Sequence, residues 1–375
     1  MPDQLLAARR VVTPARTFAP GWVHVERGHV AAVGPGDPPR PPDVDLHDGT
    51  IVPGFVDTHA HGGGGTSFDG GDPDAVERAV LAHRARGTTT MLASLVSDTV
   101  DGLIDASARL AALVDDGLLA GIHLEGPWLS PLHPGAHDPA RLSTPDERSV
   151  GRLLEATHDH LRMVTLAPEL PGAPEAIRAF VSAGVVVAIG HTDATYDQAR
   201  AALDAGAAVG THLFNAMRGL HHREPGPVAA LLEHPDAYVE LIADGVHVHP
   251  AMIGLAAAAK PHLTVLVTDA MAAAAAVDGD YPLGSLVVEV RDGIARLPDG
   301  GAIAGSTATL GATVQHAVRR AGLSLEDAVR AATATPAALH GLTRVGTLRP
   351  GAHADLVVLD DELTVTRVMH RGSWL

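Results

Sequence analysis

Short apolar runs alternate with amphipathic segments along the middle of the chain, a pattern that predicts strands separated by helices. Each run is short and rich in apolar side chains, as expected of parallel strands that are buried on both faces. The eight predicted strands span residues 51–59, 88–94, 119–126, 163–169, 185–192, 208–215, 237–245 and 263–270. Three helical segments, residues 72–87, 173–184 and 195–206, lie between them and end in glycine, a common residue just past a helix.

Eight strands that alternate with helices match the count of a (β/α)8 barrel of the TIM type. An open doubly wound sheet has the same alternation and is the alternative. Histidine and carboxylate side chains follow several of the predicted strands, and barrel enzymes build their sites at those C-terminal strand ends. We therefore predict an α/β fold centred on a barrel.

Both ends of the chain have shorter β-type runs punctuated by tight turns. These runs cover residues 5–12, 21–36, 343–351, 354–361 and 364–375. Because the two ends of a barrel chain lie close together, we expect the terminal runs to pair. The prediction is a small β-sandwich domain from residues 1–52 and 342–375, and a catalytic barrel from residues 53–341. Residues 271–304 are predicted to form a β-hairpin insertion after the eighth strand.

Composition narrows the classes of function. The 375 residues are 46% hydrophobic, which is enough for a large core, and contain no cysteine, which excludes disulfides and thiolate metal sites. The formal net charge of −17 argues against nucleic-acid and anionic-membrane partners. Residues 1–12 lack the apolar core of a signal peptide, and no apolar run is long enough to span a membrane. We expect a cytoplasmic protein with a small-molecule substrate.

Four predicted strand ends carry side chains of the types that bind zinc and related ions, and Asp269 stands at a fifth. His59 and His61 alternate in an extended segment, so both can face one ion, although a chance pair on a flexible glycine loop is the alternative. Glu125 could bind metal or cap a helix, and His191 and His212, taken singly, could be core residues. Four of the eight strands ending in such side chains are hard to explain as packing, so the pattern predicts a metal site.

Asp269 ends the eighth strand. A carboxylate beside a metal-activated water can take its proton and pass it to a leaving amine, which is the chemistry of a hydrolase. The alternative role for Asp269 is a helix N-cap.

The motifs PGFVDTHAHGGGG, HLEGPWL, GHT, THLFNAM, ADGVHV and VTDAM resemble those of the amidohydrolase superfamily. The similarity runs from end to end and is strongest to the members that deacetylate N-acetylglucosamine 6-phosphate. It implies a metal-dependent deacetylase, homodimeric, with one or two divalent ions, expected to be zinc. The rival interpretations are another amidohydrolase, such as a cyclic-amide hydrolase, and a non-catalytic metal- or sugar-binding protein.

The resemblance also implies roles for individual residues. Glu125, His191 and His212 match the principal metal site, and His59 with His61 match a pair that completes a second site in some members. Lys260 is the sole lysine, so Glu125 would take the place of the superfamily's bridging lysine.

By the same resemblance Asp269 is the acid/base and His247 polarises the acetyl carbonyl. The implied substrate contacts are Ala136, His137, Asn215, Ala216, Arg223, Asp244, His247, Ala302, Ile303 and Ala304. From the sequence alone, a surface pair between Arg223 and Glu224 is slightly favoured. The resemblance implies instead that Arg223 binds the phosphate, which a guanidinium fork suits.

Overall fold

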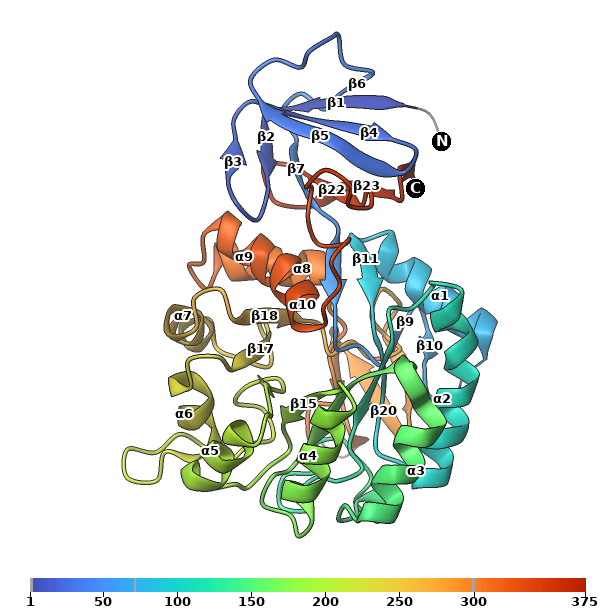
Figure 1. The fold of residues 1–375 in the computed structure, drawn as a ribbon, viewed down its shortest axis with the longest axis vertical. Helices are drawn as coiled ribbons and strands as arrows, with labels where there is room; N and C mark the ends of the chain where they lie inside the picture. Colours follow the sequence, from blue (N-terminus) through green and yellow to red (C-terminus); the bar gives the residue numbers. More distant parts are fainter. Residues whose placement is uncertain (1–2, 71, 299–300) are drawn as a thin grey trace.

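The computed structural model describes residues 3–70, 72–298 and 301–375 and has the predicted α/β architecture, with strand-rich layers at one end of a barrel (Figure 1). Seven parallel strands form one sheet whose strand order follows the sequence. They are β12 (Ala93–Leu95), β13 (Ile122–Glu125), β14 (Leu161–Leu166), β15 (Val186–Ile189), β16 (Val209–Gly210), β17 (Tyr238–Ile242) and β18 (Thr264–Val267). The first barrel strand, β8 (Phe55–Asp57), pairs in parallel with β11 (Thr88–Met91), which continues into β12 after a single residue.

The barrel closes between β8 and β18. The hydroxyl of Thr268 donates to Asp57 Oδ2 at 2.6 Å, and the amide of Asp269 donates to the carbonyl of His59 at 2.8 Å. Ala60 and Ala270 form a parallel bridge just beyond these contacts. The strands therefore form a closed ring rather than the open sheet that the sequence pattern left possible.

Helices follow most of the barrel strands and cover the outside of the ring (Figure 1). They are α1 (Pro73–Arg84), α2 (Val100–Asp115), α3 (Glu147–Thr157), α4 (Ala173–Ser182), α5 (Tyr196–Asp204), α6 (Gly226–Glu233), α7 (Pro250–Ala259), α8 (Leu310–Arg319), α9 (Leu325–Ala331) and α10 (Ala334–Leu339). The three helices predicted from the sequence are confirmed as α1, α4 and α5. Each ends before its glycine, and Gly87 and Gly206 have φ of 104° and 108°, a conformation that strains other residues.

The two ends of the chain share a six-stranded sheet, in which β22 (Leu356–Leu359) runs antiparallel to β7 (Thr50–Pro53). The other strands of this sheet are β2 (Arg10–Val12), β3 (Thr17–Phe18), β23 (Val365–His370) and β24 (Ser373–Trp374). A second sheet holds β1 (Gln4–Ala8), β4 (Gly21–Glu26), β5 (His29–Pro35) and β6 (Val44–Asp45). The two sheets bury a separate apolar core that includes Leu6, Val23, Ile51, Leu356 and Met369.

The predicted small β-domain built from both termini is thus confirmed in kind, and its boundaries at residues 52 and 342 stay a prediction. The interpretation of residues 343–351 as a β-type run is wrong. This segment forms turns, with Gly346 and Gly351 at φ of 65° and 86°, which interrupt an extended strand.

The segment after the eighth strand contains the expected hairpin and one more strand. β19 (Gly279–Leu283), β20 (Leu286–Arg291) and β21 (Ile294–Arg296) form an antiparallel sheet. Within the described ranges, no helix is long and apolar enough to cross a membrane.

Candidate active site

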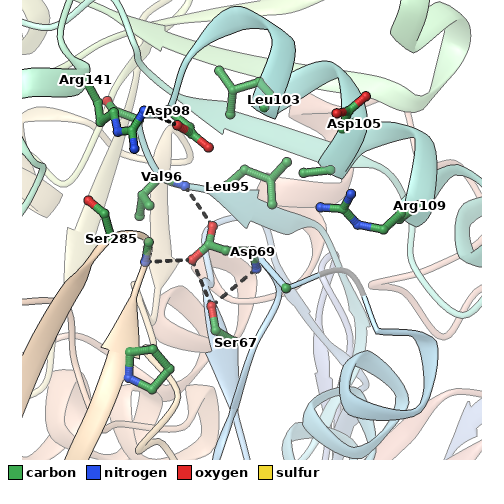
Figure 2. Close-up of a pocket in the computed structure, with 16 residues that line it drawn as sticks. Ser67, Asp69, Leu95, Val96, Asp98, Leu103, Asp105, Arg109, Arg141 and Ser285 are labelled. Carbon is green, nitrogen blue, oxygen red and sulfur yellow. Dashed lines mark hydrogen bonds and ion pairs between the residues drawn. The ribbon is translucent and has the colours of Figure 1, made fainter.

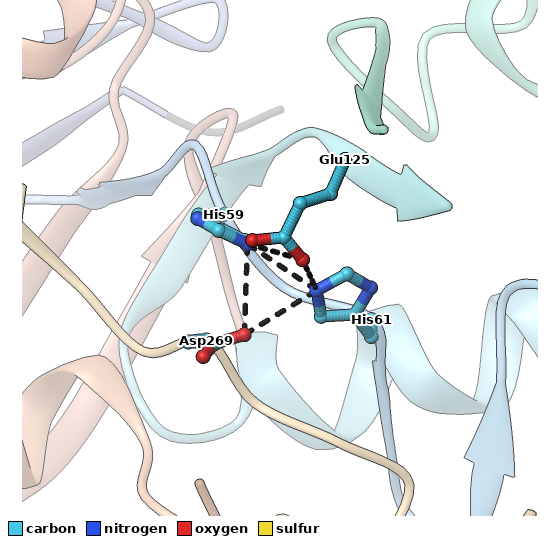
Figure 3. A group of neighbouring side chains, drawn as sticks. All are labelled: His59, His61, Glu125 and Asp269. Atoms are coloured by element: carbon cyan, nitrogen blue, oxygen red, sulfur yellow. Dashed lines mark hydrogen bonds and ion pairs between the residues drawn. The ribbon is translucent and has the colours of Figure 1, made fainter. Parts of the chain in front are cut away.

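Four predicted site residues converge at the C-terminal end of the barrel (Figure 3). Nε2 of His61 lies 3.1 Å from Oε2 of Glu125 and 3.3 Å from Oδ1 of Asp269. Nε2 of His59 lies 3.5 Å from each of the same two oxygens. The four residues come from the ends of β8, β13 and β18, so barrel closure brings together groups that are far apart in the sequence.

The other oxygen of Glu125 faces a second histidine pair. Its Oε1 lies 3.1 Å from Nε2 of His191 and 3.0 Å from Nε2 of His212, which follow β15 and β16. Glu125 therefore stands between two groups of nitrogen donors, one on each carboxylate oxygen. This geometry is that of a bridging ligand.

The donor set fits divalent cations. All five metal-ligand candidates are buried, and their donor atoms form two groups whose members lie within 4.8 Å of one another. Nε2 of His59 is 3.2 Å from Nε2 of His61, and Nε2 of His191 is 3.1 Å from Nε2 of His212. Imidazole and carboxylate are preferred zinc ligands, and facing ring nitrogens suit a shared cation.

Burial and charge act against each other in this cluster. Burial raises the pKa of Asp269, but His59 and His61 outweigh it and lower the pKa to about 2. Burial lowers the pKa of His61, but Asp269 and Glu125 raise it to about 9. Burial also lowers the pKa of His191 to about 4, which keeps that imidazole neutral, as a metal ligand must be.

Several site residues are held in strained backbone conformations. His191, His212 and Asp269 have φ of 46°, 28° and 48°, in the left-handed region that non-glycine residues rarely adopt. Such strain collects at functional sites, where the surrounding structure enforces it. The glycine run after His61 is also ordered, because its first half forms β9 (Gly62–Gly63), which pairs with β10 (Thr66–Ser67). The amides of Gly64 and Gly65 donate to the carbonyls of Ala274 and Ala272 at 2.7 and 2.8 Å. The alternative of a flexible glycine loop is therefore wrong.

A cavity of about 470 Å³ opens over the donor cluster. Most predicted site residues line it: His61, Glu125, Ala136, His137, His191, His212, Asn215, Ala216, His247, Asp269, Ala302 and Ile303. Neither Asp269 nor Glu125 is the N-cap of any helix in the described part of the chain. His137, expected to contact substrate, also lies 3.3 Å from Glu125 Oε2 and accepts the amide of Ser97.

Four predicted residues do not line this cavity. His59 lies beneath it and is fully buried, and Ala304 is buried beside it. Asp244 contacts the cavity residue His247 rather than the cavity itself, and its Oδ2 lies 2.7 Å from Nδ1 of the His247 ring. Arg223 is exposed and lies outside the cavity. Among the ion pairs of the described residues, none joins Arg223 to Glu224.

The loop that carries Ala136 and His137 is fastened to the ligand loops. The carbonyl of His133 accepts a hydrogen bond from Nδ1 of His191 at 3.0 Å, which leaves Nε2 of His191 for the cluster. Nε2 of His133 donates to Asp193 at 3.0 Å, and Arg218 makes a two-pronged ion pair with the same carboxylate. Asp193 and Arg218 thus tie the loops after β15 and β16 to the loop over the cavity.

Sequence reasoning missed two buried polar residues beneath the cluster. Glu240 lies in β17, with Oε2 3.1 Å from Nδ1 of His59. His123 lies in β13 and is bonded at both ring nitrogens, to Ser94 and to Thr165. In the sequence, each of the two is a charged or polar residue in the middle of an apolar strand. A search restricted to strand ends does not find such residues.

A second cavity, of about 550 Å³, shares Val96 with the first cavity in its lining (Figure 2). It contains none of the predicted site residues. Its central acid, Asp69, already accepts hydrogen bonds from Ser67, from the amide of Val96 and from the amide of Gly284. The cavity with the buried donors, though smaller, is the one with the chemistry of a reaction site.

Comparison with known proteins points to one group. A model of the amidohydrolase family matches residues 50–375. The chain is 37% identical to the N-acetylgalactosamine-6-phosphate deacetylase of Escherichia coli O157:H7, over 98% of each chain. It is 35% identical to the N-acetylglucosamine-6-phosphate deacetylase of Vibrio furnissii, over 92% of this chain and 88% of the relative.

Solved structures give the same result. One is a variant of the N-acetyl-D-glucosamine-6-phosphate deacetylase of Mycobacterium smegmatis, in complex with N-acetyl-D-glucosamine-6-phosphate. It superposes with a TM-score of 0.98 at 49% identity and covers 100% of this chain and 99% of its own. An enamidase, at 16% identity and a TM-score of 0.62, shares the fold alone.

Proposed function

This chain belongs to the amidohydrolase family, and we propose on that premise that it hydrolyses N-acetylglucosamine 6-phosphate to glucosamine 6-phosphate and acetate. One observation carries the proposal. The buried Glu125, with histidines on both carboxylate oxygens, lies with Asp269 at the floor of a cavity large enough for a sugar phosphate. The 49% identity over the whole chain to an N-acetyl-D-glucosamine-6-phosphate deacetylase supports this substrate.

In this proposal Glu125, His191 and His212 would hold one divalent cation, and His59 and His61, together with Glu125, would hold a second one. The nitrogen and oxygen donors favour zinc. A bound cation supplies Lewis-acid chemistry, by polarising a carbonyl oxygen and making water more acidic.

Asp269 moves the proton. Because its pKa is about 2, its carboxylate is charged near pH 7 and can accept the proton of the attacking water. The same carboxyl group then passes this proton to the nitrogen of the leaving amine. Returning the proton to the nitrogen matters because an amine leaves far more readily than an amide anion.

His247 stabilises the charge that develops on the acetyl oxygen. Asp244 accepts a hydrogen bond from Nδ1 of His247, so this carboxylate fixes the orientation of the ring at the cavity wall. A preorganised donor aimed at a developing oxyanion is a large contribution to catalysis.

The sugar and its phosphate are proposed to lie along the wall formed by Ala136, His137, Asn215, Ala216, Ala302 and Ile303. Arg223 is exposed and does not line the cavity of its own subunit, so its guanidinium is free to contact a neighbouring subunit. Leu132, Leu220 and Val246, on loops that also carry cavity residues, are 70%, 55% and 39% exposed. These features support a homodimer in which Arg223 reaches the partner's phosphate.

A cytoplasmic location completes the proposal, because a phosphorylated sugar is charged and stays in the compartment where it is phosphorylated. The formal net charge of −17 makes nucleic acid and anionic membranes poor partners.

The test is an acetate-release assay on purified protein of measured metal content. We expect kcat/KM for N-acetylglucosamine 6-phosphate to exceed that for N-acetylglucosamine by about 100-fold, because two charge-assisted hydrogen bonds to phosphate are lost. N-acetylgalactosamine 6-phosphate serves as the matched comparison. Removing the metal with a chelator should abolish turnover, and added zinc should restore it.

Equal kcat/KM with and without the phosphate would contradict the proposed substrate and favour another amidohydrolase activity. Metal binding without acetate release from any of the three sugars would favour a binding protein.

A further inference from the structure

Glu240 places a carboxylate inside the barrel, in the middle of β17. Side chains alternate along a strand, and Val239 and Leu241 pack into the core between barrel and helices. Tyr238 and Ile242 pack instead with the residues that fill the barrel interior. Glu240 therefore points inward with them, and it is fully buried.

The contacts of Glu240 contribute little to the stability of the fold. Oε2 accepts a hydrogen bond from Nδ1 of His59 at 3.1 Å and one from the amide of His212 at 3.3 Å. Oε1 has no hydrogen-bond partner among the described residues. A buried carboxylate held by so few bonds, and by no arginine or lysine, costs free energy relative to an apolar side chain of similar size.

The same contacts have a clear effect on His59. Because a carboxylate only accepts hydrogen bonds, Nδ1 of His59 carries a proton, and in the neutral ring Nε2 then presents its lone pair. Nε2 faces Nε2 of His61 at 3.2 Å, Oε2 of Glu125 at 3.5 Å and Oδ1 of Asp269 at 3.5 Å (Figure 3). The ring is thus held with its donor atom aimed into the cluster.

We infer that Glu240 is the positioning residue of His59: its carboxylate fixes the tautomer and the orientation with which His59 binds the second cation. Glu240 touches neither substrate nor cation and acts through His59. This role rests on the proposed metal centre, and it adds the residue that makes the His59–His61 side of Glu125 an efficient site.

A purely structural role predicts the opposite experimental result. If Glu240 only filled space and bonded the amide of His212, its removal would lower stability and leave cation affinity unchanged. If it positions His59, an apolar replacement lowers affinity for one cation and leaves stability equal or higher, because a buried charge is removed. Measuring both quantities on the same variants separates the two roles.

The experiment uses the full chain stripped of metal and titrated with zinc against a chelating indicator, alongside a thermal melt of each sample. Glu240→Leu should weaken one of two zinc sites by about 10- to 100-fold and leave the other unchanged. Glu240→Gln retains an acceptor for Nδ1 of His59 and should recover part of that loss. Asp355→Asn removes a buried carboxylate in the small β-domain and is the matched control, expected to keep both sites.

A double-mutant cycle shows whether the effect passes through His59. In a His59→Asn background, Glu240→Leu should change zinc affinity by less than about twofold, since the group it positions is already gone. An additional loss there, or unchanged zinc affinities in Glu240→Leu alone, would overturn the inference. So would failure of both Glu240→Leu and Glu240→Gln to fold while Asp355→Asn folds. Absence of zinc binding by the unsubstituted chain would instead refute the proposed metal centre itself.

Discussion

Asp244 Oδ2 lies 2.7 Å from Nδ1 of His247, and both side chains are only 7% exposed. The same carboxylate accepts the backbone amides of Val246 and His247 through Oδ1, at 2.8 and 2.9 Å. It therefore shapes the loop after β17 and orients the ring with separate oxygens. Burial raises the pKa of Asp244, but His247 and the backbone amides outweigh it and hold the pKa below its usual value.

Asp244→Asn tests the contact with the His247 ring separately from the contacts with the backbone amides. The amide oxygen of asparagine can still bond the backbone amides, but its NH2 group then faces Nδ1 of His247 and cannot accept the hydrogen bond that this nitrogen donates, so the ring loses the partner that orients it. We expect kcat to fall by about 100-fold, as on loss of one oxyanion donor, with little change in the melting temperature. Steady-state kinetics and a thermal melt check this, and a kcat within a factor of two of the unsubstituted enzyme would contradict the role of His247.

Asp269→Asn tests the proton carrier. Asparagine keeps the size of the side chain but cannot accept the proton of water, so we expect kcat to fall by at least about 1000-fold. Glu125, His191 and His212 remain, so at least one zinc ion should still bind. Metal analysis and acetate release are measured on the same sample, and substantial turnover by the zinc-loaded variant would exclude Asp269 as the acid/base.

Asp193→Asn tests the tie between the ligand loops and the loop over the cavity. Arg218 first and His133 second lower the pKa of Asp193 to about 2. Because this pKa is below the unfolded value of 3.8, the ion pairs stabilise the protein above about pH 4 and are lost as pH falls through 2. The variant should be less stable than the parent at pH 7, with a difference that shrinks towards pH 2.

The same substitution loosens residues 128–141, so KM should rise more than kcat falls. Urea unfolding at several pH values measures the first effect, and steady-state kinetics measures the second. A stability difference that stays constant from pH 7 to pH 2 would show that the Asp193 ion pairs are not its source.

We predict that His340 lowers the free energy of unfolding in mildly acidic solution. It is 8% exposed, and neither ring nitrogen has a hydrogen-bond partner among the described residues. Burial first, and Arg162 second, lower its pKa from 6.5 to about 4. The unfolded chain therefore binds a proton between pH 6.5 and pH 4 that the folded protein does not, and stability falls as pH falls through that window.

The contribution of His340 over the window is about 3 kcal/mol. His340→Gln should flatten the curve of unfolding free energy against pH between 6.5 and 4, whereas His221→Gln, at an exposed histidine, should not. Identical curves for His340→Gln and the parent protein would contradict the low pKa.

The candidate ligands could be predicted because they follow apolar runs directly. His59, Glu125, His191, His212 and Asp269 all stand at or just past strand ends, where a barrel collects side chains from every strand. The terminal β-domain could be predicted for a similar reason, since its strands have a local pattern. The turn at residues 343–351 was misread because its apolar residues alternate with glycines whose φ values only the folded chain reveals.

Glu240 and His123 could not be predicted in the same way. Their partners lie far away in sequence: Glu240 and His59 are 181 residues apart, and His123 and Thr165 are 42 apart. A polar residue inside an apolar strand shows only that something must compensate for its burial. Which side chain does so depends on the strand register around the ring.

Strand ends and side-chain types are local properties, so the amino-acid sequence was enough to identify the candidate site residues and to predict that they gather at one end of a barrel. Only the tertiary structure decided that Glu125 gives one oxygen to each histidine pair, that Arg223 lies outside its own cavity and that Glu240 holds His59. These facts depend on distances across the closed barrel. Such distances are set by the contacts that join the ends of β8 and β18 and by the tilt of every strand between them.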